Sequence, residues 1–156
     1  MIENFNDNFR ELCLNLKIDE RKFILGLSGG IDSMALLSLL KRFIVSNKSL
    51  KIEVFPVIID HDLRSNSSNE AKAVQDIAIS HGFKTIIKKI IIKKPSGNIQ
   101  NWARKERRRI LCDVAFEFSA YLILGHHIDD LVETIFMRSV KGSGIEGLIG
   151  MQDRMI

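Results

Sequence analysis

The sequence predicts an α/β protein in which helices cover both faces of a parallel, Rossmann-like sheet. Short apolar runs rich in β-branched residues alternate along the chain with longer stretches whose apolar residues recur every three or four positions. The apolar runs lack the polar alternation of a half-exposed strand, and strands that are apolar on both faces are typical of a parallel sheet buried by crossover helices. Such sheets bind ligands beyond the carboxyl ends of their strands.

Size and composition favour a single globular domain over residues 1–156. The chain has 156 residues, of which 46% are hydrophobic and 27% charged. These values suit one domain with its own core and exclude a collagen-like or disordered chain.

The sequence also predicts a cytoplasmic protein that does not contact membranes. The apolar runs are well short of the roughly 18 to 20 residues that a membrane span needs. The N-terminal segment carries acidic residues early and lacks the basic start and apolar core of a secretory signal. Cys13 and Cys112 make neither a disulfide framework nor a CxxC metal pair, which fits a reducing compartment.

The first half of the chain is expected to contain a helix followed by two strand–helix units. The elements are a helix at about 4–16, a strand at 23–27, a helix at about 31–43, a strand at 52–59 and a helix around 71–78 that Gly82 closes.

The second half continues the alternation. The elements are a strand at 84–92, a long helix with an apolar stripe at 99–118, a strand at 120–125 and a helix from about 128 to 140.

The turn after the first strand is expected to hold phosphate. It reads Ser28-Gly29-Gly30-Ile31-Asp32-Ser33, and we call residues 28–33 the glycine turn. Its glycines allow close backbone approach, and the helix that follows offers unpaired N–H groups to an anion. No Lys-Ser or Lys-Thr follows, so it is not a Walker loop. The alternative is an ordinary glycine turn with a Ser or Asp cap.

Residues 26–30 also match G-x-S-x-G, the nucleophile elbow of α/β-hydrolases. Ser28 would then need partners from later in the chain, with candidates Asp60 or Asp113 and His126 or His127. No HGGG-like oxyanion segment is present, and this hypothesis leaves Asp32 and the basic residues without a role.

Acidic and histidine side chains follow two further strands, as Asp60-His61-Asp62 and as the run from His126 to Glu133. Carboxylates beside a phosphate loop usually hold Mg²⁺. The alternatives are helix capping by Asp129 and Asp130, and a zinc site that lacks the spacing of a known helical zinc motif.

Positive charge is concentrated in residues 84–109, which we call the basic block. It contains ten Lys or Arg and one acid, whereas the rest of the chain has 13 basic and 18 acidic residues. Such a block favours a phosphate-rich partner, the alternative being a solvated face. Within it, Arg107 shares a helical stripe with Ala103 and Val114, so we expect it to point toward the sheet and to need an anion.

Together, the motifs resemble the catalytic domain of the tRNA(Ile)-lysidine synthase family, within the PP-loop ATP pyrophosphatases. The motifs are SGGIDS at 28–33, DHDLR at 60–64, WARKERR at 102–108, LGHHIDDLVET at 124–134 and KGSG at 141–144. The resemblance covers about residues 23–151 and implies an adenine nucleotide alpha hydrolase-like fold. It also implies that ATP and Mg²⁺ adenylylate the C2 position of a cytidine in the CAU anticodon of tRNA(Ile). Free L-lysine then displaces AMP to give lysidine.

The resemblance further implies roles for individual residues. The ATP phosphates are expected on Ser28, Gly29, Gly30, Ile31, Asp32 and Ser33. Mg²⁺ is expected on Asp32 and Asp130. The catalytic set is expected to be Asp32, Arg104, Arg107, His126 and Asp130.

The chain departs from the family pattern at Asp62, where glycine is usual, and at Arg109, near which an aromatic residue is common. It also stops soon after the KGSG segment. From this we expect a truncated catalytic domain without tRNA-body-binding domains. One sheet edge or helix face should be left partly uncovered, so we expect a homodimer or a poorly stable monomer, with lysidine formation weak or absent and ATP binding retained. Two other functions are considered: tRNA thiolation, whose enzymes use CxxC pairs that this chain lacks, and nucleotide binding without catalysis.

Overall fold

The computed structural model describes residues 2–17, 21–62, 66–91, 95 and 97–125. The chain divides after Leu124 into two units, and the fold below is that of the first unit, residues 1–124. The expected helix at 128–140 and the residues His126, His127, Asp129 and Asp130 lie outside the described residues.

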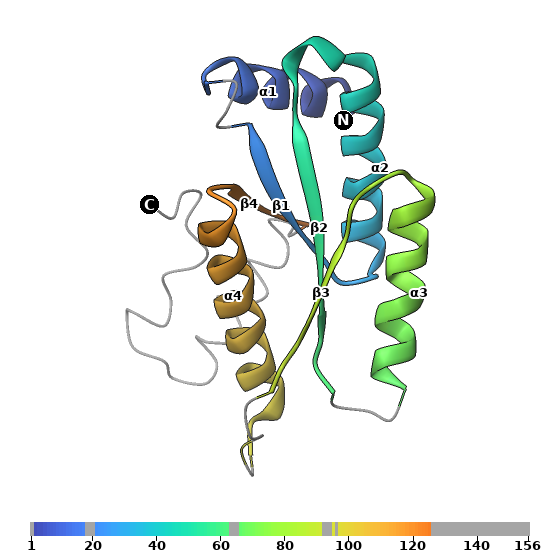
Figure 1. Ribbon diagram of the computed structural model, residues 1–156, viewed down its shortest axis with the longest axis vertical. Helices are drawn as coiled ribbons and strands as arrows, with labels where there is room; N and C mark the ends of the chain where they lie inside the picture. Colours follow the sequence, from blue (N-terminus) through green and yellow to red (C-terminus); the bar gives the residue numbers. More distant parts are fainter. Residues whose placement is uncertain (1, 18–20, 63–65, 92–94, 96, 126–156) are drawn as a thin grey trace. The chain divides into compact units, whose positions relative to one another are not determined.

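The described strands form one parallel sheet, which confirms the predicted fold class. Its four strands are β1 (Lys22–Leu27), β2 (Glu53–Asp60), β3 (Ile86–Lys89) and β4 (Tyr121–Leu124), in the order β3-β2-β1-β4. Strand β1 therefore pairs with β2 on one side and β4 on the other (Figure 1). At such a reversal of strand order the crossovers leave in opposite directions and open a crevice beyond the carboxyl ends.

Helices cover both faces of the sheet, as the apolar strands predict. The described helices are α1 (Ile2–Leu14), α2 (Ile31–Ser46), α3 (Ser67–Ser80) and α4 (Ile99–Glu117), with a short 3₁₀ turn η2 (Lys48–Leu50). In Figure 1 the strands separate α4 from α2 and α3. None of the described helices is long and apolar enough to cross a membrane.

Alternation along β1 divides the buried residues between two cores. Phe23, Leu25 and Leu27 pack with α1, α2 and α3 on one face, whereas Ile24 packs with α4 on the other. Both sets are almost completely buried, which is why the strand shows a continuous apolar run rather than polar alternation.

Strand β3 is shorter than expected, with four residues where the apolar run suggested 84–92. It lies at an edge of the described sheet and pairs only with the last four residues of β2, from Val57 to Asp60. The length of β3 is therefore set by the β2 residues with which it pairs and not by the length of the apolar run. Ile91, which follows β3, is 92% exposed.

Gly26 lets α4 and β4 approach the centre of β1 closely. A Cβ atom at Gly26 would lie 2.6 Å from Cδ2 of Leu124 and 2.9 Å from Cδ1 of Leu111. The first glycine of the G-x-S-x-G match therefore has a packing role, independent of any nucleophile at Ser28.

Candidate functional site

The glycine turn connects the carboxyl end of β1 to the start of α2. Gly29 has φ +79°, and a Cβ atom there would lie 2.7 Å from Cγ2 of Val74 on α3. Backbone conformation and space therefore both require glycine at this position. Gly30 is extended, with φ −72°, and is the N-cap residue of α2.

The buried Ser33 side chain holds the turn in shape. Its hydroxyl donates to the carbonyl of Gly30 at 2.9 Å, accepts from the backbone N–H of Ser28 at 3.3 Å and lies 3.1 Å from the Ser28 hydroxyl. Ser28, Gly29 and Gly30 are exposed. The turn thus presents open backbone at a helix N-terminus, where the first N–H groups have no helical acceptor and favour an anion.

Asp32 lies in the first turn of α2 and is exposed, next to this open backbone. An exposed carboxylate fits Mg²⁺, which keeps several waters and is usually bound by one or two carboxylates together with substrate phosphates. Among the described residues no group of three or more His, Cys, Asp or Glu forms a metal site. The second predicted ligand, Asp130, lies outside them.

The second side of the site is the carboxyl end of β2. Asp60, 5% exposed, accepts hydrogen bonds from the Ser67 hydroxyl at 2.7 Å, the Asp62 N–H at 2.9 Å and the Ser68 hydroxyl at 2.6 Å. Burial acts to raise the pKa of Asp60, but these hydrogen bonds and the charge of Lys89 outweigh it and lower the pKa.

Asp60 therefore joins the end of β2 to the start of α3, and its carboxylate is occupied. The Ser28 hydroxyl likewise contacts Ser33 and the Gly30 N–H. Among the described residues, no hydrogen bond joins the side chain of Ser28 or Asp60 to a histidine ring, and the candidate triad partners His126 and His127 lie outside these residues.

Asp62 adopts the left-handed conformation, with φ +49°. A positive φ strains residues other than glycine, which fits the glycine that the family resemblance leads us to expect at this position. In this chain the carboxylate of Asp62 pairs with Lys89 of β3, at 3.3 Å.

A cavity of about 120 Å³ lies between these two strand ends, α3 and α4. We call it the strand-end cavity. It is small beside the roughly 300 to 1,000 Å³ of drug-sized ligand pockets, so it accommodates part of a ligand. Its polar lining residues are Ser28, Asp60, His61, Ser67, Glu70 and Arg107.

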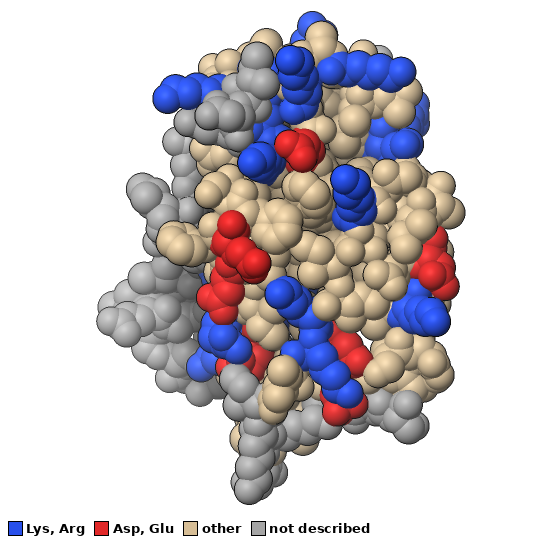
Figure 2. All heavy atoms as spheres, viewed as in Figure 1, with Lys and Arg blue, Asp and Glu red and all other residues tan. Residues whose placement is uncertain are grey.

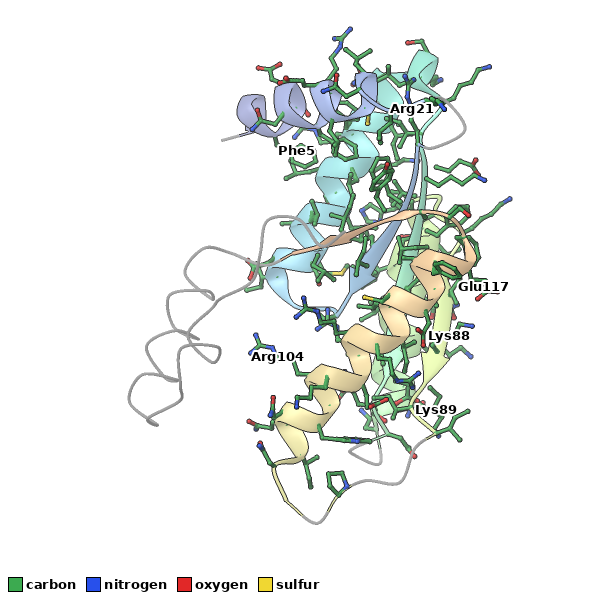
Figure 3. The ribbon with its side chains drawn as sticks, turned by 90° about the vertical axis from the view of Figure 1, so that its left-hand side faces the viewer. Phe5, Arg21, Lys88, Lys89, Arg104 and Glu117 are labelled. Atoms are coloured by element: carbon green, nitrogen blue, oxygen red, sulfur yellow. The ribbon has the colours of Figure 1, made fainter. Side chains whose placement is uncertain are left out.

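Arg107 lines the strand-end cavity, which confirms the direction that its helical stripe predicts. It is partly buried, and burial followed by the nearby charge of Arg104 lowers its pKa. Arg104 is exposed, and Figure 3 shows its side chain extending away from α4. The two arginines of the predicted catalytic set therefore have different surroundings.

His61 is a lining residue that belongs to the DHDLR motif at the expected ligand edge, although it is absent from the predicted catalytic and phosphate-binding sets. Its Nδ1 atom is buried and has no hydrogen-bond partner among the described residues. Burial and the charge of Arg107 lower its pKa, and Asp60 offsets this only in part, so the ring is neutral at pH 7. Its position directly after a strand end was the available signal.

The described residues of the basic block differ in their surroundings. Arg109 pairs with Glu106 and Asp113, at 2.9 and 3.0 Å. In Figure 3 Arg104 lies on one side of α4, and Lys88 and Lys89 of β3 lie on the other. The face seen in Figure 2 shows acidic side chains interspersed with basic ones.

Comparison with known proteins places this site in a family. The sequence matches the profile of the PP-loop domain over residues 1–156. It is 40% identical over 128 residues to a tRNA(Ile)-lysidine synthase of Orientia tsutsugamushi (strain Boryong), covering 81% of this chain and 28% of that protein. It is 38% identical over 136 residues to a protein of the same name from Streptococcus sanguinis (strain SK36), covering 86% and 30%.

A third relative, the tRNA(Ile)-lysidine synthase of Thermosipho africanus (strain TCF52B), is 31% identical over 159 residues, covering 99% of this chain and 36% of that protein. This chain thus spans about a third or less of the length of these relatives.

A solved structure shares the fold. The U34-tRNA thiolase NcsA from Methanococcus maripaludis, with its [4Fe-4S] cluster, superposes with a TM-score of 0.67 at 22% identity, covering 80% of this chain and 44% of that one. Because the profile match spans the whole sequence and the glycine turn, parallel sheet and strand-end cavity accompany it, the chain belongs to the PP-loop domain family.

Proposed function

We propose that this chain is the ATP-binding catalytic part of a tRNA(Ile)-lysidine synthase. The observation that carries the proposal is the exposed glycine turn at the N-terminus of α2, directly beside a cavity that holds a partly buried arginine. Lysidine synthases at 31 to 40% identity support the assignment of the substrate. The partners are then tRNA(Ile) with a CAU anticodon and free L-lysine.

In the proposed reaction, the 2-oxygen of the anticodon cytidine attacks the α-phosphorus of ATP. The bond between the α-phosphorus and the bridging oxygen breaks, and pyrophosphate leaves. The ε-amine of lysine then attacks C2, the bond from C2 to the adenylyl oxygen breaks, and AMP leaves. No covalent bond to the protein forms.

The residues of this chain would supply electrostatic stabilisation. The open N–H groups of the glycine turn are suited to the phosphates, and the donors of Arg107 act in a partly desolvated cavity where they are stronger than in water. Arg104, His126 and Asp130 complete the proposed catalytic set. Mg²⁺, held by Asp32 and Asp130, would neutralise phosphate charge.

A direct assay tests this function. The full chain is incubated with ATP, Mg²⁺, L-lysine and a tRNA(Ile) transcript with a CAU anticodon, and pyrophosphate, AMP and lysidine are measured. A transcript with uridine in place of the anticodon cytidine is the control. Lysidine on the first transcript alone supports the proposal, whereas ATP binding without pyrophosphate release favours nucleotide binding without catalysis.

Asp32→Asn tests the metal role separately, with Asp76→Asn on the exposed side of α3 as the matched control. Asp32→Asn is expected to weaken nucleotide binding in the presence of Mg²⁺ and to leave the fold intact. If nucleotide affinity in both variants equals that of the unmodified chain, Asp32 has no metal role.

The thiolation alternative receives no support from the cysteines. Cys13 is buried in the core on the α1 side of the sheet, and Cys112 lies on α4 on the other side, both as free thiols. The NcsA likeness at 22% identity concerns the fold alone.

A further inference from the structure

Two side chains that line the strand-end cavity have polar groups without partners among the described residues. Nδ1 of His61 is buried and makes no hydrogen bond within that part of the chain. Arg107 is partly buried, and none of the ion pairs found among the described residues includes it. Buried polar groups are nearly always hydrogen-bonded in native proteins, so the buried Nδ1 of His61 indicates a ligand or ordered water, and the donors of the partly exposed Arg107 are open to the same ligand.

These two side chains come from elements far apart in the sequence and meet at one place. His61 follows β2, and Arg107 is in the middle of α4 on the same face of the sheet as Ile59. Both side chains line the strand-end cavity. Ser28, the first residue of the glycine turn, lines the same cavity.

The hydrogen-bond donors of the pair define the chemistry of the group that would fit. Asp60 and Glu70 also line the cavity, and the carboxylate of Asp60 is already occupied by three hydrogen bonds. A guanidinium has five donors and no acceptor, and a neutral imidazole has one N–H donor. Both groups can therefore donate to one anion placed between them, and hydrogen bonds to an ionised acceptor are stronger than neutral ones. An oxygen-rich anion therefore matches the pair better than a nucleobase edge, which would need a donor and an acceptor side by side.

We propose that His61 and Arg107 together bind the α-phosphate of the nucleotide, with the Nδ1–H of His61 and the guanidinium of Arg107 donating to its oxygens. The α-phosphate is the group that links the nucleoside to the phosphates on the glycine turn, and the cavity borders that turn at Ser28. This inference rests on the proposed ATP-binding function. His61 is thereby assigned as a phosphate-binding residue.

The test compares AMP with adenosine by calorimetric titration of the full chain, because the two ligands differ only in the α-phosphate. We expect His61→Leu to weaken AMP binding about tenfold, as for one hydrogen bond to a charged group, and to leave adenosine binding unchanged. His61→Asn, whose amide nitrogen occupies nearly the position of Nδ1, should restore most of the preference for AMP.

The matched control is His81→Leu. His81 lies at the end of α3, where its Nδ1 is 2.9 Å from the carbonyl of Ile77, and it does not line the strand-end cavity. This variant should bind AMP and adenosine as the unmodified chain does. An equal loss of both ligands in His61→Leu, or no loss of either, would overturn the proposal and indicate a nucleoside contact or a bound water.

Nitrogen-15 NMR of the unmodified chain gives a readout that does not depend on the stability of a variant. The Nδ1 resonance of His61 should shift on addition of AMP and stay in place on addition of adenosine. A resonance unmoved by saturating AMP contradicts the proposal. If the unmodified chain binds neither AMP nor ATP, the proposed function itself fails, which is a different outcome from ATP binding that is insensitive to His61.

Discussion

At the scale of single residues, Gly29 is the position where backbone geometry and packing both exclude a side chain. We predict that Gly29→Ala destabilises the protein by about 2 kcal/mol or more, because a left-handed L-residue costs roughly 1 to 2 kcal/mol and the added methyl group also meets Val74. It should also weaken ATP binding by moving the turn. Urea unfolding and ATP titration measure the two effects.

The neighbouring Gly30 offers a matched control for this change. Gly30 is extended, and the nearest atom to its added Cβ would be the Ser28 hydroxyl oxygen at 3.5 Å. Gly30→Ala should therefore change stability by less than about 0.5 kcal/mol. Equal stability losses in the two variants would show that the turn does not have the described geometry.

Asp62 is a second residue with positive φ, and replacing it with glycine should stabilise the folded protein. We predict that Asp62→Gly raises stability by about 0.5 kcal/mol, because relief of the left-handed strain exceeds the contribution of an exposed ion pair with Lys89, about 0 to 1 kcal/mol. Asp62→Ala removes the ion pair and keeps the strain, so it should be less stable than the original chain. Thermal unfolding of the three proteins ranks them, and a ranking with Asp62→Gly last contradicts the prediction.

At the scale of elements, Asp60 determines how β2 connects to α3. Its carboxylate accepts from two serine hydroxyls in the first turn of α3, so α3 begins at Ser67 although the apolar stripe starts only at Ala71. The carboxylate thus fixes the first turn of α3 to the end of β2 through two side-chain hydroxyls.

The lowered pKa of Asp60 predicts a pH dependence. Because the folded protein lowers this pKa below the ordinary 3.8, the carboxylate contributes stability that is fully present above about pH 4 and is lost as the pH falls through the folded value. We expect Asp60→Asn to cost about 1 to 3 kcal/mol at pH 7. Urea unfolding at several pH values should show the difference from the original chain shrinking only below pH 4, and a difference that is constant down to pH 2.5 would exclude this role.

The edge position of β3 and the close packing of α4 against β1 are two further properties at the scale of elements. The length of β3 follows from the four residues of β2 that it pairs with, and the approach of α4 to β1 follows from Gly26. Neither is visible in hydrophobic periodicity, because both depend on which elements become neighbours.

At the scale of the whole molecule, the positive charge of the basic block predicts that tRNA binding is mainly electrostatic. We predict that tRNA affinity falls steeply with salt, and that replacing Lys88, Lys89, Lys93 and Lys94 with Gln flattens this dependence. The log–log slope should change by about 0.9 for each phosphate that the variant no longer neutralises. Filter binding between low and physiological salt measures the slope.

Lys48 and Lys51 provide the control for the charge change. They lie around η2, before the amino end of β2 and so at the opposite end of the sheet from the strand-end cavity. Lys48→Gln with Lys51→Gln should leave the slope unchanged. A flat salt dependence in the original chain, or an unchanged slope in the fourfold variant, would mean that the basic block is only a solvated face.

Self-association is the second prediction for the whole molecule. Phe116 on α4 is 87% exposed and Tyr121 at the start of β4 is 48% exposed, and exposed apolar side chains of this size favour association. We expect light scattering to show a homodimer and Phe116→Glu to shift it toward monomer. A monomer at all concentrations for the original chain refutes the prediction.

The sequence by itself determined the α/β class, the order of the described strands and helices, the position of the glycine turn and the inward direction of Arg107. These features depend on residue type and on spacings of two to four residues, which local backbone geometry translates directly into structure. The roles of His126 and Asp130 remain predictions from the motifs.

Only the tertiary structure decided which of these features share one site. His61 and Arg107 line one cavity, the Asp60 carboxylate accepts from the Ser67 and Ser68 hydroxyls, and Val74 lies against Gly29. Each contact joins elements whose separation along the chain carries no periodic signal, because strand register and the paths of the crossovers bring them together. The partners of a buried polar atom therefore become visible only when the sheet and its helices are assembled.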